Sequence, residues 1–318
     1  MNKNIIIYPH GKFNLSDGGV TVQYYFAKIL SAHYKQSVYI INKYDNNTIN
    51  PLFNEFLNID SLSENLIENT IVIYCEGIKG NPLNAKYVIR WMLSKLGQNV
   101  SFNHYDTWNN KELVYFFNSE LEFNKYNHIK LLPVFYINTI YNDNNLHNRH
   151  GSCYTIRKAK KMIDKLIFIH PEDSFEIKRG HTQDKYMKIF NKYEYFYSYD
   201  PLTFLSLIAI MCGCISIVVE IEGVKKQDYF KMTGIYDYMC SHNLTNIYGL
   251  AYGNSDEEIN YAKKTIHLGK RQILNMQQWY LNKYIPSFIN DLNNFQTNEN
   301  TIENSKELLL NENIENKE

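Results

Sequence analysis

Short apolar runs alternate with longer amphipathic segments along most of the chain. The runs are rich in β-branched residues and end at Gly, Pro or Asn, which is typical of buried strands in a parallel sheet. We expect such strands at residues 4–8, 38–41, 70–74, 113–117, 130–136, 152–158, 166–170, 195–198, 215–220 and 247–253. Helical spacing of apolar residues predicts helices that start after residue 19 and at 84–95, 182–193, 201–212, 223–232, 255–268 and 273–292. Because strands and helices alternate, the sequence predicts an α/β fold with parallel sheets.

The chain of 318 residues is longer than one hydrophobic core usually supports, so two domains are expected. Residues 142–151, NDNNLHNRHG, are polar, rich in Asn and without periodicity, which is typical of a domain linker. We therefore place a first domain at residues 1–145 and a second at 146–295. Residues 296–318 are polar and acidic, and we expect them to form a disordered tail.

Charge and cysteine content narrow the class of protein. The formal net charge is +0 at pH 7, whereas a dedicated nucleic-acid binder carries a basic excess, so no nucleic-acid partner is expected. The five cysteines include no Cys-x-x-Cys pair, which favours a reducing compartment inside the cell. Met1 leads into the first strand without a basic and apolar leader, so the sequence predicts a cytoplasmic protein.

Residues 195–219, YFYSYDPLTFLSLIAIMCGCISIVV, combine an apolar run with a helix start signal. Asp200 is suited to cap a helix that begins at Pro201, with the Thr203 hydroxyl beside the free amides of the first turn. Such a helix start favours a bound diphosphate, because it carries unsatisfied N–H groups and a partial positive charge. Two alternatives stay open. They are a plain buried helix and strand, and a membrane span over residues 202–219, which several polar residues interrupt.

The order of residues in this block resembles the donor-binding segment of glycosyltransferases with the two-domain GT-B fold. Asp200 stands where many members of that family have a Glu, and Ala209, a turn at Gly213 and a β-branched strand follow at the family's spacing. Ile208 stands where the family has a second Glu, which usually holds the nucleotide ribose. The resemblance is clearest over residues 151–295.

This resemblance implies both a fold and an activity. It implies two Rossmann-like parallel-sheet domains that face a cleft, with a closing helix that crosses back to the first domain. It also implies that a sugar moves from a nucleotide-diphosphate donor on the second domain to an acceptor hydroxyl on the first. The departure at Ile208 leaves the ribose contact to Ser206 or Glu222. We expect a glycan or a lipid-linked molecule as the acceptor.

Basic residues and glycines elsewhere match donor-binding positions of the same family. Arg157 and Lys158 stand where basic residues pair with the donor diphosphate, and Gly18 and Gly19 match a glycine-rich loop facing the cleft. Fixed cations stabilise a leaving nucleoside diphosphate as its negative charge grows. A solvated helix face is the alternative for the lysines between residues 158 and 165. The expected donor contacts are Gly18, Gly19, Arg157, Lys158, Ser174, Tyr199, Asp200, Pro201, Thr203 and Ser206.

The catalytic candidates are Asp17, His104, Asp106 and Asp200. His104 and Asp106 stand in an aromatic-rich loop that offers a base and surfaces for sugar stacking, although such a pair is also common by chance. Asp17 precedes the two glycines, and Asp200 stands at the acidic position of the family. Glu76 follows a strand end, where ligands gather in open α/β sheets, and is a candidate by position only.

The sequence lacks several motifs of other enzyme classes. It has no two Asp residues separated by one residue, and its His and Cys residues lack zinc spacing. It also has no Walker loop and no Gly-x-Ser-x-Gly turn. We therefore expect a reaction that needs no metal and no cofactor besides the nucleotide-sugar co-substrate.

Other interpretations stay open beside glycosyl transfer. A nucleotide-sugar epimerase of GT-B-like fold would share the diphosphate site but needs two acids beside the sugar. A non-catalytic sugar-nucleotide-binding protein would lack a working base. The helix expected at 84–95 carries Lys86, Arg90 and Lys95 among apolar residues. It fits a core-facing helix with a solvated side, a peripheral contact at the inner membrane face, or a contact with an acidic acceptor.

Overall fold

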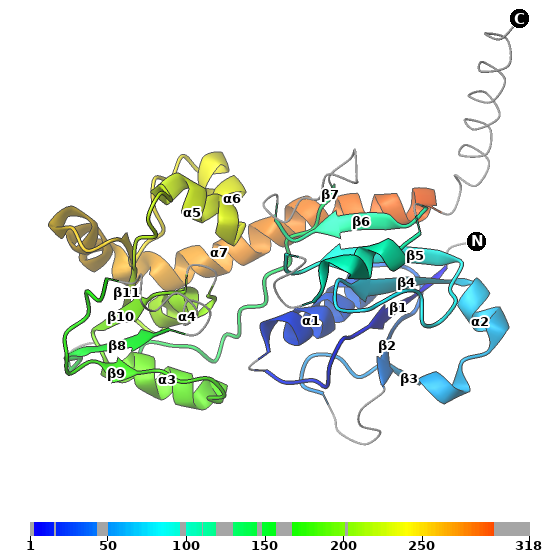
Figure 1. The fold of residues 1–318 in the computed structure, drawn as a ribbon, viewed down its shortest axis with the longest axis horizontal. Coiled ribbons are helices and arrows are strands. Elements are labelled where there is room, and N and C mark those ends of the chain that lie inside the picture. Colours follow the sequence, from blue (N-terminus) through cyan, green and yellow to red (C-terminus); the bar gives the residue numbers. More distant parts are fainter. Residues whose placement is uncertain are drawn as a thin grey trace, which may run out of the picture.

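The protein is represented by a computed structural model, which describes residues 3–15, 17–42, 50–95, 100–109, 111–118, 130–144, 148–156, 167–200 and 203–295. Two parallel β-sheets lie side by side, each with helices packed against it (Figure 1). A long helix, α7 (Asp256–Phe295), runs along both halves. The α/β fold of two Rossmann-like parallel-sheet units that the sequence predicts is confirmed.

The first sheet has the order β3-β2-β1-β4-β5-β6-β7 in the described residues, and each neighbouring pair is parallel. Its strands are β1 (Asn4–Tyr8), β2 (Val38–Asn42), β3 (Phe56–Asn58), β4 (Thr70–Cys75), β5 (Tyr87–Met92), β6 (Leu113–Phe116) and β7 (Lys130–Leu131). Its helices are α1 (Gly18–His33), η1 (Ile59–Ser61), α2 (Glu64–Glu68) and η2 (Phe102–Thr107). The central strands β1 and β4 are almost wholly buried, because their β-branched sequences suit burial on both faces.

The second sheet has the order β12-β11-β10-β8-β9 in the described residues and is also parallel throughout. Its strands are β8 (Ser152–Thr155), β9 (Phe175–Glu176), β10 (Tyr195–Ser198), β11 (Ile215–Val218) and β12 (Leu250–Tyr252). Its helices are α3 (Gln183–Lys192), α4 (Leu205–Met211), α5 (Lys226–Thr233) and α6 (Tyr236–Ser241), together with much of α7. Helix α3 buries the three residues that its periodicity predicts, Tyr186, Ile189 and Phe190.

The helix expected at residues 84–95 is wrong. All six residues of β5 are buried, and the strand pairs with β4 on one side and β6 on the other. Arg90 is fully buried in this strand and forms an ion pair with Glu112. A short apolar run does not distinguish a buried strand from a buried helix by periodicity, and the buried cation produced a false basic face. The membrane contact inferred from that helix therefore loses its basis.

The helix expected to start at Pro201 begins later, at Leu205, and Pro201 lies outside the described residues. Asp200 does not cap this helix. Its main-chain carbonyl accepts a hydrogen bond from the Thr203 N–H at 3.2 Å, so a turn separates β10 from α4. The Thr203 Oγ1 accepts from the Leu205 N–H at 3.3 Å. The helix ends as expected, since Gly213 adopts a φ of 80° in the turn toward β11.

Further boundaries also differ from expectation. Residues 167–170 form no strand, and the edge of the second sheet is β9. Within 130–136 only β7 pairs with the sheet. The helices expected at 255–268 and 273–292 are one helix, α7, which contains Pro286.

Helix α7 contributes to both hydrophobic cores. Its earlier part supplies Ile273, Met276 and Tyr280 to the core of the second half. Its later part supplies Ile285, Phe288 and Leu292 to the core of the first half. The closing helix that the resemblance implies therefore does cross back. The domain boundary at residue 145 stays a prediction, and the expected tail at 296–318 lies outside the described residues. None of the described helices is long and apolar enough to cross a membrane.

Candidate active site

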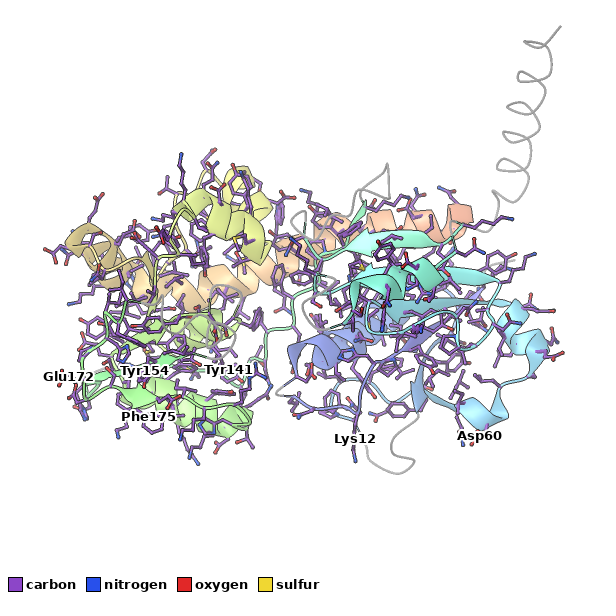
Figure 2. All side chains as sticks on the ribbon, viewed as in Figure 1. Lys12, Asp60, Tyr141, Tyr154, Glu172 and Phe175 are labelled. Carbon is purple, nitrogen blue, oxygen red and sulfur yellow. The ribbon has the colours of Figure 1, made fainter. Side chains whose placement is uncertain are left out.

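Segments that follow the carboxyl ends of strands in both sheets enclose a shared cavity. The first cavity, of about 220 Å³, is lined by Gly18 and Gly19 at the start of α1 and by Phe204 and Ile208 of the α4 segment. Its wall also includes Tyr141, which lies on the side of the second half that faces the first (Figure 2). Because ligands gather at the carboxyl edge of parallel sheets, this cavity is the natural place for a substrate.

A second cavity, of about 160 Å³, adjoins the first. The side chains of Leu93, Phe117, Phe135 and Phe204 contribute to the walls of both. The second cavity also carries hydroxyl and amide side chains, namely Ser94, Asn118, Thr203, Ser206 and Thr233. The Asn118 Nδ2 donates to the Met232 carbonyl at 3.1 Å, and this bond joins the two halves beside the cavity.

Ser206 gives the second cavity its clearest chemical signal. The residue is 2% exposed, and its Oγ has no hydrogen-bond partner within the described part of the chain. Leaving a buried hydroxyl unsatisfied costs about 1–3 kcal/mol. The Oγ is closed off from solvent behind the cavity wall, so it reaches a ligand only when that wall moves. Glu222, the other candidate for the ribose contact, is exposed and is not among the described residues that line either cavity.

Asp200 and Tyr199 lie just past the carboxyl end of β10. Asp200 is 1% exposed, and its carbonyl accepts from the Ser198 Oγ at 3.0 Å as well as from Thr203. The Tyr199 Oη accepts from the Ile169 N–H at 2.9 Å and lies 2.7 Å from the His170 Nδ1. These contacts fix the approach to α4, and neither residue is among the described lining of the cavities.

Ser174 lies at the opposite edge of the second sheet. Its Oγ is 2.6 Å from the Ser152 Oγ, at the amino end of β8. Its neighbours Glu172 and Phe175 lie toward the end of the molecule that is remote from the first half (Figure 2). The predicted donor contact of Ser174 therefore has no support from its position. Arg157 and Lys158, like Pro201, lie outside the described residues, and their contacts with the diphosphate stay predictions.

Asp17 and the two glycines form the start of α1. The Asp17 Oδ1 accepts from the Val20 N–H at 3.1 Å and caps the helix. Gly18 and Gly19 are its first two residues and line the first cavity, so the Asp17 carboxylate adjoins this wall, although Asp17 is not among the described lining residues. A Cβ on Gly18 would have no atom within 4 Å, which means that the space over this residue is open.

His10 is a functional candidate that the sequence analysis missed. It lies in the turn after β1, at the carboxyl edge of the first sheet. Its ring packs against two glycines, because a Cβ on Gly19 would lie 3.3 Å from the His10 Cε1 and one on Gly77 would lie 3.2 Å from the His10 Cβ. The His10 Nδ1 is 3.0 Å from the Gln23 Nε2 and 3.4 Å from the Cys75 Sγ. The only sequence signal for His10 is its place after the first strand.

Gln23 decides which nitrogen of His10 carries the proton. Its amide is 1% exposed, and its Nε2 donates to the Gly19 carbonyl at 3.0 Å as well as to the His10 Nδ1. The bond to Gly19 identifies this end of the amide as the NH₂ group, so the His10 Nδ1 is an acceptor. The neutral imidazole then carries its hydrogen on Nε2, which is a donor. His10 is exposed and is not among the described residues that line either cavity.

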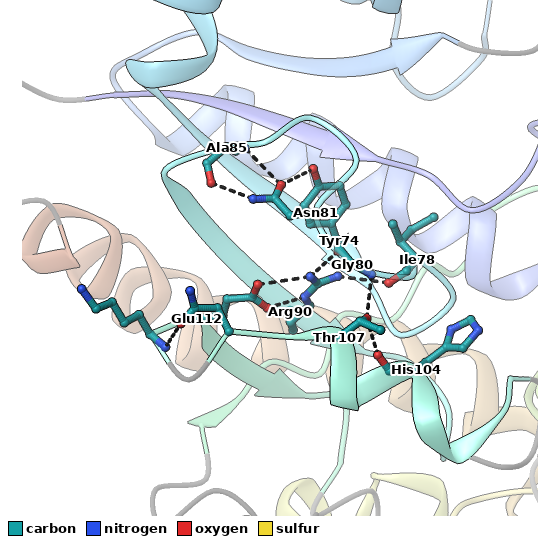
Figure 3. Close-up of polar contacts among 11 residues, drawn as sticks. Tyr74, Ile78, Gly80, Asn81, Ala85, Arg90, His104, Thr107 and Glu112 are labelled. Carbon is teal, nitrogen blue, oxygen red and sulfur yellow. Dashed lines mark hydrogen bonds and ion pairs between the residues drawn. The ribbon is translucent and has the colours of Figure 1, made fainter.

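A buried ion pair holds the loop after β4 in place (Figure 3). The Arg90 Nε is 2.6 Å from the Glu112 Oε2, and its Nη1 and Nη2 donate to the carbonyls of Ile78 and Gly80 at 3.1 and 2.5 Å. The guanidinium also lies 4.9 Å from the ring of Tyr74 and 4.8 Å from that of Trp108. These contacts fix the loop that presents Gly77 to His10.

His104 and Asp106 lie on η2, which packs against the same loop. The Thr107 Oγ1 accepts from the Gly80 N–H at 2.8 Å and donates to the His104 carbonyl at 2.6 Å (Figure 3). Neither His104 nor Asp106 is among the described residues that line a cavity. The predicted catalytic role of this pair therefore has no support from either cavity.

Glu76 is buried at the end of β4. Its Oε2 accepts from the Leu93 N–H at 2.9 Å and its Oε1 from the Ser94 Oγ at 2.6 Å. The two carboxylate oxygens of Glu76 thus hold Leu93 and Ser94, which line the cavities, so Glu76 shapes the site. In the described part of the chain no group of three or more His, Cys, Asp or Glu residues is arranged to hold a metal ion.

The chain matches no protein-family model and no curated protein. Among solved structures it is similar to T4 phage BGT in complex with UDP and Mn²⁺, at 10% identity over 87% of this chain and 98% of that one, with a TM-score of 0.45. It is also similar to a glycosyltransferase from Rickettsia africae ESF-5, at 12% identity over 92% and 98% of the two chains, with a TM-score of 0.47. A third similarity is to spinosyn forosaminyltransferase SpnP, at 7% identity over 91% and 99%, with a TM-score of 0.36. The fold itself is established by the strand order and register described above.

Proposed function

We propose that this protein transfers a sugar from a nucleotide-diphosphate donor to an acceptor hydroxyl in the cleft between its two sheets. The observation that carries the proposal is the pair of adjoining cavities at the carboxyl edges of both sheets, with the unpartnered Ser206 hydroxyl in one wall. In this arrangement Ser206 and Thr203 contact the donor, and Arg157 and Lys158 pair with its diphosphate. The reaction needs no metal, and it takes place in the cytoplasm.

Asp17 is the proposed base for the acceptor hydroxyl. Its Oδ1 caps α1, which leaves Oδ2 to accept a proton beside the open space over Gly18. His10 has a different role, because its Nε2–H is a donor. It stabilises negative charge that develops on an oxygen during transfer, as a fixed donor does without reorganisation.

The first test is turnover with nucleotide sugars. Purified protein is mixed with UDP-, GDP-, TDP- and CMP-linked sugars, and release of the free nucleotide is measured with and without EDTA. We expect release from one donor class that persists in EDTA. Absence of both nucleotide binding and release with every donor would contradict the proposal, whereas loss in EDTA would contradict only its metal independence.

The second test separates a ligand contact of Ser206 from a structural one. Ser206→Ala removes an unsatisfied hydroxyl, so thermal stability should be unchanged or slightly higher, while donor affinity falls by about 0.5–1.5 kcal/mol. Ser216→Ala is the matched control, since the Ser216 Oγ is also buried without a partner in the described chain but lies on β11 outside both cavities. Calorimetry that finds equal donor affinity in both variants would remove Ser206 from the site.

A further inference from the structure

The wall of the first cavity is unusually free of charge. No described residue that lines it is Asp, Glu, Lys, Arg or His. Several of its polar side chains are engaged elsewhere: the Thr21 Oγ1 donates to the Asn14 carbonyl at 2.9 Å, and the Asn138 Nδ2 donates to the Gln183 Oε1 at 2.6 Å. A sugar placed here would bury several hydroxyls that lack partners, at about 1–3 kcal/mol for each. The cavity is therefore unsuited to a glycan.

Aromatic and aliphatic side chains dominate this wall instead. Phe135 and Phe204 lie nearly parallel, with ring centroids 6.4 Å apart and 18° between their planes, and Phe117 meets Phe135 edge to face at 4.9 Å. Phe204 remains 37% exposed although it borders a cavity, which marks apolar surface available to a ligand. Aromatic walls favour flat apolar groups through stacked and edge-to-face contacts.

The volume of the cavity indicates which groups it can hold. An apolar cavity of roughly 150 Å³ in a protein interior accepts one benzene molecule. The first cavity, at about 220 Å³, is larger by about the size of a small ring substituent. Its volume therefore fits a substituted single ring or a compact pair of fused rings.

We infer that the first cavity binds the aromatic ring of the acceptor, so that the acceptor is a small aromatic alcohol. This inference rests on the proposed function, because the ring's binding site becomes an acceptor site only if sugar transfer occurs beside it. In the reaction the acceptor oxygen forms a bond to the anomeric carbon, and the bond from that carbon to the diphosphate oxygen breaks. The electron pair leaves with the nucleoside diphosphate, and the acceptor proton passes to the Asp17 carboxylate.

The test measures ring binding without catalysis. Binding of 4-methylphenol and 2-naphthol to the full chain is followed by ligand-observed saturation-transfer NMR, with glucose as the polar probe. Ile208→Trp fills the cavity from α4, and we expect it to weaken binding of both aromatic probes by roughly tenfold or more. Leu268→Trp adds the same bulk at a 41% exposed position of α7 that does not line the cavity, and it should leave binding unchanged.

Each result bears on the inference in a defined way. Binding of the aromatic probes that Ile208→Trp abolishes supports it, provided that circular dichroism shows both variants to be folded. No binding of either aromatic probe, equal binding in the two variants, or displacement of 4-methylphenol by glucose would overturn it. Nucleotide release is measured in parallel. If the protein releases nucleotide but binds neither aromatic probe, only the inference that the acceptor is aromatic is overturned. Ring binding without any nucleotide binding overturns the proposed function instead.

Discussion

A single buried amide sets the chemistry available to His10. Gln23 donates from the same nitrogen to the Gly19 carbonyl and to the His10 Nδ1, so its orientation is fixed by a main-chain group that cannot change role. His10 is therefore assigned as a hydrogen-bond donor through Nε2, which separates it from the proton acceptor Asp17. His10 and Asp17, which have opposite roles, thus both precede Gly18 and Gly19 in the sequence.

Replacing Gln23 with Glu should reverse the tautomer of His10. A carboxylate only accepts hydrogen bonds, so it would bind an Nδ1–H and leave Nε2 without its hydrogen. Side-chain ¹⁵N NMR of the neutral ring reports the protonated nitrogen, and His10→Gln assigns the His10 signals. Gln23→Met, which has no donor or strong acceptor, is the control and should enforce neither form. An Nδ1–H tautomer in the unmodified protein would show that the role given to His10 is wrong.

His170 should make the stability of the protein depend on pH. Its ring stacks on Tyr154, with centroids 3.9 Å apart and 15° between the planes, and desolvation by burial lowers the pKa of His170. The unfolded chain, with a His pKa of about 6.5, then binds a proton more readily than the folded protein. The contribution of His170 is fully present above that value and is lost as the pH falls through it.

The comparison that isolates this effect is His170→Phe, which keeps a stacking ring but does not titrate. Between about pH 8 and about pH 5 the melting temperature of the unmodified protein should fall more than that of the variant. Differential scanning calorimetry at several pH values gives both slopes. Parallel slopes would mean that His170 is not protonated differently in the folded and unfolded states.

At the scale of elements, Gly269 lies within α7 and lets this helix pack closely against the second half. Gly269 lies where α7 crosses the α4 and β12 region, and a Cβ there would lie 2.3 Å from the Ile210 Cγ2 and 3.0 Å from the Tyr248 carbonyl oxygen. Gly at this position lets the helix approach the second sheet. The local cost of Gly in a helix is offset by the contact that it permits.

Gly269→Ala should therefore destabilise the protein, although the same change in an exposed helix is stabilising. Overpacking of this kind costs about 1–3 kcal/mol. Ile210→Ala removes one of the clashing atoms, so the double variant should be more stable than the sum of the two single effects implies. Urea denaturation of all four proteins measures the coupling, and strict additivity would show that the two residues do not clash.

The elements differ in how far their sequences determine them. β1 and β10 match their predicted bounds, because each is a short run of β-branched or aromatic residues with clear ends. β5 was missed because Arg90 looks solvent-exposed in the sequence, and its partner Glu112 lies 22 residues away. The start of α4 lies later than predicted because a turn, in which the Asp200 carbonyl accepts from the Thr203 N–H, precedes the helix.

Some residues of the candidate site could also be predicted from the sequence, whereas others could not. The sequence, with its resemblance to the GT-B family, predicted Gly18, Gly19, Thr203 and Ser206 as donor contacts. Gly18 and Gly19 line the first cavity, and Thr203 and Ser206 line the second. The sequence did not predict a role for His10. Its position depends on Gly77, which the helices α1 and α2 and the strands β2, β3 and β4 separate from it in the chain. Local patterns thus predict residues whose role is local, whereas contacts between distant segments need the structure.

On the scale of the whole molecule, α7 joins the two halves through polar as well as apolar contacts. The Tyr115 Oη donates to the Asp291 Oδ2 at 2.6 Å, and the Gln277 Nε2 donates to the Tyr25 Oη at 2.7 Å. Desolvation by burial raises the pKa of Tyr115, so its hydroxyl keeps its proton and remains a donor at physiological pH. The helix therefore limits how the halves that enclose the cavities are placed relative to each other.

The path of α7 also governs the order in which the protein becomes complete during synthesis. Ile285, Phe288 and Leu292 belong to the core around the first sheet, yet the ribosome makes them after every strand of both sheets. The first half thus leaves the ribosome with an apolar face that nothing of its own covers, and domains in this condition are prone to aggregate. Its final packing has to wait for the end of the chain, so the segment synthesised first is among the last to reach its native core.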